Sequence, residues 1–437
     1  MIWHVNTSVL IDIDELRVGM FIQLGMGWIN HPFPTSSFRV SSEEQIAILR
    51  ELGISQVRHV PGKSVPQSPE SDALGLDAAM TMAGPGPGTE QEAQALEEES
   101  QEGLAQAPWS LEDAVFERCA RRYEEATGVY GAVTSLVLTA PDLVRLQVDA
   151  VVGSCVADLV QSGDRALYLL AHMQGQRLAQ HSVNTMVLAL LLARALGQGA
   201  AQLQDVGVAA LLHDLGKIML PPHIGEPGAP LSAADLPRYQ NHVGLSVELG
   251  QRMGLAAEVL EAISQHHEMA DGSGFPQQLK FAALVRGGQI LALVNAYDRL
   301  CNPLHGASAL TPHEALSHLF ARQRGQFDAV VLGAFIRTMG VYPPGTLVQL
   351  TDGRYGQVLV SAPAASPLRP GVLVHDERVP RGQARVLALA RHPGLGVSRS
   401  VKAAQLPRAA FDYLSPQPRS SYFFEHVRHV DAGEGGA

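Results

Sequence analysis

The sequence has few cysteines, no long uncharged hydrophobic run and no excess of positive charge. Its three cysteines, Cys119, Cys155 and Cys301, are scattered without a CxxC pair, which excludes a disulfide framework and a zinc knuckle. No uncharged stretch reaches the ~20 residues that a membrane-spanning helix needs, and the N-terminus lacks the apolar core of a signal peptide. The formal net charge of −11 argues against a nucleic-acid polymer or an anionic membrane as the main partner. We therefore expect a cytoplasmic protein.

The amount and distribution of apolar sequence predict several domains. Hydrophobic residues make up 46% of the 437 residues, and a chain of this length corresponds to roughly two to four domains. Strand and helix signals alternate over residues 1–61, with a helix from Ser41 or Ser42 to Gly53, and they predict a small N-terminal α/β domain. Residues 62–108 are rich in Gly, Pro, Gln and Glu and have few large apolar side chains. We expect them to form a disordered acidic linker.

Helical periodicity dominates from Trp109 to about Met339. The segment RLAQHSVNTMVLALLLARALG has apolar residues at helical spacing, and Gly197 stands where a helix would end. We divide this part of the chain into connecting helices over residues 109–165 and a helical domain over residues 166–338.

The last hundred residues change to the period of β-strands. GTLVQLTDGRYGQVLV contains two alternating apolar runs around Asp352 and Gly353, a strong hairpin signal, and PGVLVHDERVP predicts a further strand. Residues 339–437 are therefore predicted to form a small C-terminal β-rich appendage. The predicted fold class is multidomain and mainly α, with a helical bundle, the small N-terminal α/β domain and this appendage.

The helical block contains a series of histidines at helix ends and one His-Asp pair. His181 is expected to precede the first long helix, His213 and Asp214 end another helix in LLHDLGKIMLPPHI, and His242, His266 and His267 follow. Burying an imidazole beside a carboxylate is costly unless each group has a partner. One such histidine alone is most simply a core residue with satisfied ring nitrogens. Five of them with an aspartate indicate a metal site, and imidazole with carboxylate favours Zn, Fe, Mn or Ni over Ca or Mg.

The spacing also suggests how these residues share their ligands. Neighbouring residues on a helix point about 100° apart, so His266 and His267 are expected to serve two metals or opposite sides of one. Asp214 has two carboxylate oxygens and could bridge a metal pair. Lys217 lies one turn beyond His213 and could hold a phosphate beside the metals.

The motifs LLHDLGKIMLPPHI and HHEMADGSGFP, at their spacing in this chain, resemble the HD-GYP subgroup of HD-domain metal-dependent phosphohydrolases. The resemblance covers residues 166–338 and implies an HD-domain helical bundle, two or three metals, usually iron or manganese, and hydrolysis of cyclic di-GMP. ELRVGMFI and GWINHPFP resemble a small uncharacterised domain often found ahead of HD-GYP domains. The implied metal ligands are His181, His213, Asp214, His242, His266, His267 and, at a position where the family has aspartate, Asn295.

The resemblance also implies catalytic and substrate-binding residues. Asp214 and Lys217 would be catalytic, and Lys217 would also contact phosphate. Gly274, Phe275 and Pro276 stand where the family has Gly-Tyr-Pro, and the Phe275 ring could stack on a guanine without supplying the tyrosine hydroxyl. The implied substrate-binding residues are Lys217, Gly274, Phe275, Pro276 and Asp298, the last of which matches a second family aspartate.

Three positions depart from the family pattern. Arg177 replaces a glutamate ligand of members with three metals, so we expect two divalent metals, Fe or Mn, with Zn or Ni as alternatives. Asn295 brings an amide oxygen without charge, which should lower the affinity of one metal. The segment CNPLHG stands where the family has an arginine-containing segment that grips the ligand, and it contains no arginine.

Two functions therefore remain open. The first is a metal-dependent phosphodiesterase that hydrolyses cyclic di-GMP or a related small nucleotide in bacterial signalling. The second is a catalytically degenerate regulatory module of the same fold that acts by binding a ligand or a protein. Both leave room for a signalling-protein partner and for a homodimer.

Overall fold

The computed structural model of the chain has two compact units, residues 1–108 and 109–437, and each is described here by itself. None of the helices among the described residues is long and apolar enough to cross a membrane. The structure describes residues 8–23, 37–40, 46, 49–50, 56–61, 113–161, 165–170, 177–227, 230–303, 309–363, 366–416 and 419–426. The predicted acidic linker lies outside these residues.

The N-terminal unit contains a small antiparallel sheet with strand order β1-β4-β2-β3. Its core includes Ile22 and Val57 from the strands. It also includes Ile46 and Leu49, which are helical and lie within the predicted helix. The predicted mixture of strands and a helix is therefore present. The strands are β1 (Val9–Asp12), β2 (Phe21–Gln23), β3 (Ser37–Arg39) and β4 (Gln56–His59).

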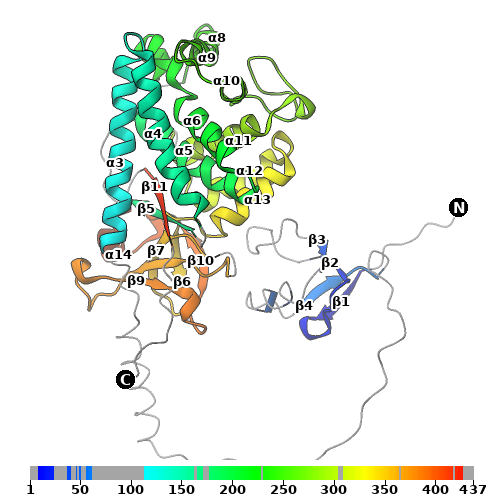
Figure 1. The fold of residues 1–437 in the computed structure, drawn as a ribbon. Helices are drawn as coiled ribbons and strands as arrows, with labels where there is room; N and C mark the ends of the chain where they lie inside the picture. Colours follow the sequence, from blue (N-terminus) through cyan, green and yellow to red (C-terminus); the bar gives the residue numbers. More distant parts are fainter. Residues whose placement is uncertain are drawn as a thin grey trace, which may run out of the picture. The chain divides into compact units, whose positions relative to one another are not determined.

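The second unit is built mainly from helices (Figure 1). The helices are α3 (Asp113–Leu136), α4 (Pro141–Val160), α5 (Arg177–Ala195), α6 (Ala200–Leu212), α7 (Pro222–Gly225), α8 (Leu236–Gln240), α9 (His242–Arg252), α10 (Ala257–Ser264), α11 (Arg286–Cys301), α12 (Pro312–Gln323), α13 (Ala329–Met339) and α14 (Arg408–Leu414), with the short 3₁₀ helix η4 (Leu215–Met219) after α6.

Helix α5 is the centre of this unit. Every residue from Leu178 to Ala193 is buried, because α5 contacts α3, α6, α11 and α13 and the strand β11. A helix that is buried on all sides has no solvent face, so its polar side chains need partners inside the protein. His181 lies inside α5 rather than before it, which corrects its predicted place ahead of the first long helix.

A seven-stranded sheet gathers at one end of the helices (Figure 1). The predicted hairpin is present as β6 and β7, and Gly353 in its turn has φ +89°, a conformation that suits glycine. The predicted strand in PGVLVHDERVP is β8. The strands are β5 (Arg165–Leu170), β6 (Leu347–Leu350), β7 (Tyr355–Val360), β8 (Gly371–Val374), β9 (Val386–Ala388), β10 (Val397–Val401) and β11 (Ser421–His426).

The sheet joins segments that are far apart in the sequence. Strand β5 pairs with β11 along its whole length, from Ser421 opposite Leu170 to His426 opposite Arg165, and it also pairs with β7. The β-rich C-terminal region and the start of the helical domain therefore share one sheet. The mainly helical fold with strand-containing ends is confirmed, whereas the exact domain boundaries remain predictions.

Candidate metal centre

The centre begins at the turn where α6 ends. His213 caps α6, Asp214 leads into η4, and both side chains are fully buried. At Gly216 a side chain has no room, because a Cβ atom there would lie 2.2 Å from the carbonyl oxygen of His242. The Gly216 N–H donates to Ser246 Oγ at 2.8 Å. Glycine in this position therefore lets the start of α9 pack against the turn, which brings His242 beside Asp214.

Two groups of potential metal ligands meet at Asp214. Within each group, one ligand atom from every residue lies within 4.8 Å of the others, and all members are buried. The four-residue group consists of Asp214, His242, His266 and His267, and the three-residue group consists of His181, His213 and Asp214.

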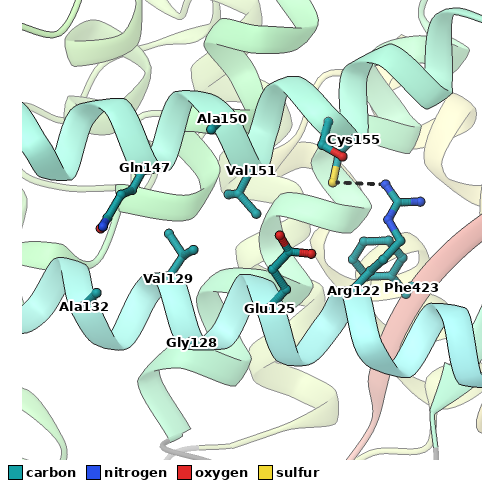
Figure 2. Close-up of a pocket in the computed structure, with 11 residues that line it drawn as sticks. Arg122, Glu125, Gly128, Val129, Ala132, Gln147, Ala150, Val151, Cys155 and Phe423 are labelled. Atoms are coloured by element: carbon teal, nitrogen blue, oxygen red, sulfur yellow. Dashed lines mark hydrogen bonds between the residues drawn. The ribbon is translucent and has the colours of Figure 1, made fainter.

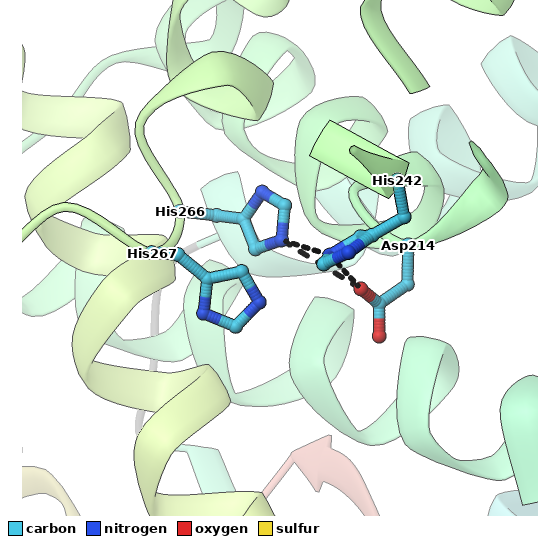
Figure 3. A group of neighbouring side chains, drawn as sticks. All are labelled: Asp214, His242, His266 and His267. Atoms are coloured by element: carbon cyan, nitrogen blue, oxygen red, sulfur yellow. Dashed lines mark hydrogen bonds and ion pairs between the residues drawn. The ribbon is translucent and has the colours of Figure 1, made fainter. Parts of the chain in front are cut away.

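The two carboxylate oxygens of Asp214 face different groups. Oδ1 lies 3.2 Å from His242 Nε2 and 3.6 Å from His266 Nε2 (Figure 3). Oδ2 lies 3.4 Å from His181 Nε2 and 3.5 Å from His213 Nε2. The structure thus brings together the five histidines and the aspartate that the sequence singled out, with the aspartate between them.

Four of the histidine rings are oriented through Nδ1. Each of these Nδ1 atoms faces an oxygen that can only accept a hydrogen bond, so Nδ1 carries the proton and Nε2 of a neutral ring keeps its lone pair. This is the form in which imidazole binds a metal. The contacts are His213 Nδ1 to Ala210 O at 2.7 Å, His242 Nδ1 to Tyr239 O at 2.5 Å, His266 Nδ1 to Ile263 O at 2.6 Å and His181 Nδ1 to Asp298 Oδ2 at 2.6 Å.

The inward-facing atoms fit a cation. The Nε2 atoms of the two rings in the three-residue group are 3.2 Å apart, and those of His242 and His266 are 3.3 Å apart. Two lone pairs at this separation repel each other unless a positive charge lies between or beside them. Among the described residues, Asp214 Oδ1 and His267 Nε2 are also buried without a hydrogen-bond partner. Nitrogen and carboxylate donors in this arrangement suit divalent Zn, Fe, Mn or Ni.

Burial keeps the rings of His213, His242, His266 and His267 neutral. It lowers the pKa of His242 to about 4 and that of His266 to about 4, although Asp214 acts in the opposite direction in both cases. Burial also lowers the pKa of His213, and burial together with neighbouring His266 holds the pKa of His267 well below its usual value. The rings are therefore available as ligands at neutral pH.

Two cationic side chains contact Asp214 on the Oδ2 side. Lys217 Nζ contacts Oδ2, and the Nη2 atom of Arg299 lies 3.3 Å from it. Burial alone would raise the pKa of Asp214, but Lys217, His213 and Arg299 outweigh it and hold that pKa well below its usual value. Asp214 is consequently ionised, and part of its charge is already compensated by protein cations.

Arg299 is a site residue that the sequence reasoning missed. Its Nε donates to Asn295 Oδ1 at 2.8 Å, and its Nη1 donates to the Tyr239 hydroxyl at 2.7 Å. The amide oxygen of Asn295, proposed from the sequence as a metal ligand, is thus engaged with a guanidinium. The spacing contained a signal, because Arg299 follows Asn295 by four residues and must share its face of α11.

Asp298 lies behind His181 with both oxygens engaged. Oδ2 accepts from His181 Nδ1, and Oδ1 accepts from Asn184 Nδ2 at 2.9 Å and Asn302 Nδ2 at 2.8 Å. A carboxylate in this place orients the imidazole from outside the ligand shell. The predicted contact of Asp298 with substrate is not tested by this arrangement and stays a prediction.

The Gly274-Phe275-Pro276 segment packs directly on His267. A Cβ atom at Gly274 would lie 2.5 Å from His267 O, so only glycine permits this close approach. The Phe275 N–H donates to the same oxygen at 3.1 Å, and the Phe275 ring stacks on the His267 ring with 4.4 Å between centroids. In this structure the Phe275 ring therefore supports a histidine of the centre.

A buried glutamate that the sequence reasoning also missed holds this loop. Glu268 is 1% exposed, and its carboxylate accepts the N–H groups of Gln277 at 2.6 Å and Leu279 at 2.8 Å. Glu268 directly follows His266 and His267 in the sequence, and from the sequence alone a glutamate at this position would be expected to face solvent. Its burial shows that it fixes the loop beside His267.

One cavity lies beside the centre and another lies apart from it. A small one, of about 20 Å³, is lined by His181, Arg177 and Arg419 among others, and burial together with the charge of Arg177 lowers the pKa of Arg419. The CNPLHG segment contains no arginine, but Arg177 and Arg419, from other parts of the chain, lie near the centre. A larger cavity, of about 350 Å³, lies between α3 and α4 and shares no lining residue with the histidine groups (Figure 2).

Comparison with known families agrees with this geometry. Residues 165–331 match the HD domain family. The chain therefore contains an HD domain over these residues. Residues 8–142 match a domain of unknown function, DUF3391, so this family spans the predicted N-terminal domain and reaches beyond α3. The family-level resemblance inferred from the motifs is therefore confirmed, and the HD domain contains all the histidines and carboxylates of the centre.

Several curated proteins are similar to this chain. A cyclic di-GMP phosphodiesterase from Pseudomonas aeruginosa is 29% identical over 374 residues, which cover 80% of this chain and 81% of the relative. A cyclic di-GMP phosphodiesterase response regulator from Xanthomonas campestris is 29% identical over 34% of this chain and 39% of its own. A 3'3'-cGAMP-specific phosphodiesterase from Vibrio cholerae is 26% identical over 40% of this chain and 34% of its own.

Solved structures are also similar to this chain. One of them is an HDG"Y"P protein from Bdellovibrio bacteriovorus, which is 16% identical and matches 75% of this chain and 98% of its own with a TM-score of 0.42.

Proposed function

We propose that this protein is a two-metal phosphodiesterase that hydrolyses cyclic di-GMP. The observation that carries the proposal is the position of Asp214, whose two oxygens face two separate sets of imidazole Nε2 atoms. Such an arrangement supports two divalent ions bridged by one carboxylate, and we propose Fe or Mn for both. The relatives from Pseudomonas aeruginosa and Xanthomonas campestris, which are named for cyclic di-GMP hydrolysis, support the substrate.

The chain supplies the ligands and the charge that this reaction needs. Bound divalent ions would supply Lewis-acid activation of a water molecule and of the phosphodiester. The histidines and Asp214 would hold these ions, and the fixed Nδ1 bonds would keep each Nε2 aimed without reorganisation. Lys217 and Arg299 would neutralise negative charge on the phosphate oxygens. The contacts of both cations with Asp214 Oδ2 support this role.

Hydrolysis by the metal-loaded protein is the direct test. The full chain, reconstituted with Mn²⁺ or with Fe²⁺ under anaerobic conditions, should bind two ions and convert cyclic di-GMP to linear or mononucleotide products. A parallel assay with 3'3'-cGAMP is needed, because one relative is specific for that nucleotide. Turnover of cGAMP alone would replace the proposed substrate, and no turnover of either nucleotide by a two-metal protein would refute the phosphodiesterase.

A second candidate function is a regulatory module that binds the nucleotide without hydrolysing it. The observation in its favour is that Lys217 and Arg299 already compensate Asp214 Oδ2, the oxygen on which the three-residue group depends. Asn295 accepts a hydrogen bond from Arg299 but has no negative charge, so it leaves the charge of Arg299 available to Asp214. Equilibrium binding of cyclic di-GMP to a protein that retains one ion and shows no turnover would favour this candidate.

We propose that either function operates in the cytoplasm on a small nucleotide. A signalling-protein partner and a homodimer stay predictions. Size measurement of the purified chain, with and without cyclic di-GMP, tests the homodimer directly.

A further inference from the structure

His181 differs from the other oriented histidines in what holds its ring. The Nδ1 atoms of His213, His242 and His266 donate to backbone carbonyls three residues earlier in the chain. The Nδ1 atom of His181 faces a side chain instead, the fully buried carboxylate of Asp298, at 2.6 Å. The direction of this ring therefore depends on whatever fixes the carboxylate.

Two asparagine amides fix the carboxylate. Asn184 Nδ2 on α5 and Asn302 Nδ2 at the end of α11 both donate to Asp298 Oδ1, at 2.9 and 2.8 Å. With Oδ1 held by these two donors, Oδ2 remains for the His181 N–H. A buried carboxylate with three donors is held in one orientation.

The C-terminal segment helps to determine which way the two amides point, and for Asn184 it does so together with the Tyr123 hydroxyl, which donates to Asn184 Oδ1 at 3.3 Å. The Ser420 N–H donates to Asn302 Oδ1 at 2.9 Å, and the Tyr422 N–H donates to Asn184 Oδ1 at 3.3 Å. Ser420 O accepts from both amide nitrogens, at 2.9 Å from Asn184 and 3.1 Å from Asn302. An amide side chain can be turned by 180° with little change of shape. Backbone N–H groups on both amide oxygens select the orientation that presents NH₂ to Asp298.

The position of Ser420 is itself well determined. Ser420 directly precedes β11, which pairs with β5 residue by residue, and Tyr422 on β11 is fully buried. Neither the HD domain match, which ends at residue 331, nor the DUF3391 match includes this segment. The contact therefore links the family's metal centre to a part of the chain outside it.

We infer that Ser420 and Tyr422, through Asn184, Asn302 and Asp298, position His181 for a divalent metal, so that the C-terminal sheet is part of the metal centre. The inference rests on the metal pair of the proposed function and not on hydrolysis. Its consequence is local: the segment supports the three-residue group and leaves the four-residue group unaffected.

Substitution of Asn302 tests this inference. Asn302 is half-buried at the end of α11, and Asn302→Ala removes one donor to Asp298 together with the acceptor of the Ser420 N–H. We expect the Kd of one of the two Mn²⁺ ions to rise roughly 10- to 100-fold, as is usual when such outer partners are removed, with the other Kd unchanged. Gln405→Ala is the matched control, because Gln405 Oε1 accepts a backbone N–H at 2.8 Å in the same C-terminal region without touching Asp298.

A double-mutant cycle separates positioning from general destabilisation. Asp298→Asn removes the carboxylate through which Asn302 is inferred to act. In that background Asn302→Ala should have little further effect on either Mn²⁺ Kd, because the two residues belong to one network. Fully additive effects, or an equal loss of both ions in Asn302→Ala alone, would overturn the inference.

Hydrogen exchange on the wild-type chain gives a test that needs no variant. Because coupling between two sites is reciprocal, Mn²⁺ binding should slow amide exchange at Ser420–Phe423 more than at Val397–Val401 on the far edge of the same sheet. Equal protection of both peptides would contradict the link. A wild-type chain that takes up only one ion overturns the inference together with the two-metal centre, whereas a two-metal chain without nucleotide hydrolysis refutes only the proposed function.

Discussion

The two groups around Asp214 are built in different ways. In the four-residue group, His242 and His266 are held by backbone carbonyls three residues earlier, and no protein cation contacts Asp214 Oδ1 among the described residues. In the three-residue group, His181 is held by a carboxylate 117 positions away, and Asp214 Oδ2 is shared with Lys217 and Arg299.

The difference teaches that one half of the centre is prepared locally and the other depends on distant parts of the chain. Local i to i−3 bonds form with the helix ends themselves, and the remaining ring of the four-residue group, His267, is supported by the nearby Phe275. The three-residue group needs the network behind His181 and has to compete with protein cations for Asp214 Oδ2. We therefore expect the four-residue group to bind the tighter ion.

The largest effect is expected from Asp214→Ala, which removes the residue that both groups share. Because each group loses a charged ligand, both ions should be lost and hydrolysis abolished. Metal content per chain, measured after dialysis, checks this expectation. His223→Ala is the control, since His223 is exposed on α7 in the same motif and belongs to neither group. An Asp214→Ala protein with an unchanged metal content would rule out the bridging role.

Substituting one histidine from each group should separate the two ions. His266→Ala should remove the tighter ion, because it takes a nitrogen ligand from the four-residue group. His213→Ala should remove the weaker ion and leave the tighter one in place. Titration of each metal-free variant with Mn²⁺ distinguishes the cases. If both variants lose the same ion, the two groups do not bind separate metals and the comparison fails.

Acid should destabilise the metal-free protein mainly through the four-residue group. As the pH falls below about 6.5, histidines of the unfolded chain take up protons, whereas His242 and His266 in the folded chain, with pKa values of about 4, do not. The unfolded state therefore binds more protons, and the free energy of unfolding falls between pH 6.5 and about 4.

Denaturant unfolding of the metal-free chain at pH 7.5, 6.0 and 5.0 measures this slope. His266→Gln should flatten it, because the substituted side chain does not titrate. A wild-type profile that is level over this range would show that the buried rings do not control the acid response.

The smallest effect is expected from Asn295→Asp, which should change only the affinity of the weaker ion in the three-residue group. A carboxylate at this position would pair with Arg299, whose Nε lies 2.8 Å from Asn295 Oδ1, and would draw the guanidinium away from Asp214 Oδ2. The weaker ion should then bind about tenfold more tightly, the order expected of one screened unit charge, while the tighter ion is unchanged.

Mn²⁺ titration of Asn295→Asp beside wild type tests this expectation. Asp298→Ala serves as the comparison, because loss of the carboxylate behind His181 should weaken the same ion. An unchanged affinity in Asn295→Asp combined with complete loss of one ion in Asp298→Ala would indicate that position 295 has no influence on the centre.

Local sequence patterns were sufficient for much of the fold. Apolar spacing predicted the helical block, and alternation around Asp352 and Gly353 predicted the β6–β7 hairpin, because both depend on side chains that are neighbours along the chain. The His-Asp pair with its surrounding histidines marked the centre, since buried imidazoles and carboxylates need a common partner.

The tertiary structure alone decided how these residues are used. The sequence offered Asp298 as a substrate contact and Asn295 as a ligand, and both roles stay predictions. Packing adds that Asp298 lies behind His181 and that Asn295 accepts a hydrogen bond from Arg299. Packing also brings Ser420 to Asn302, 118 residues away. No local periodicity records such contacts, because they arise only when α5, α11 and β11 meet. The sequence identified the candidate ligands, and for His181 the orientation depends on elements that are distant along the chain.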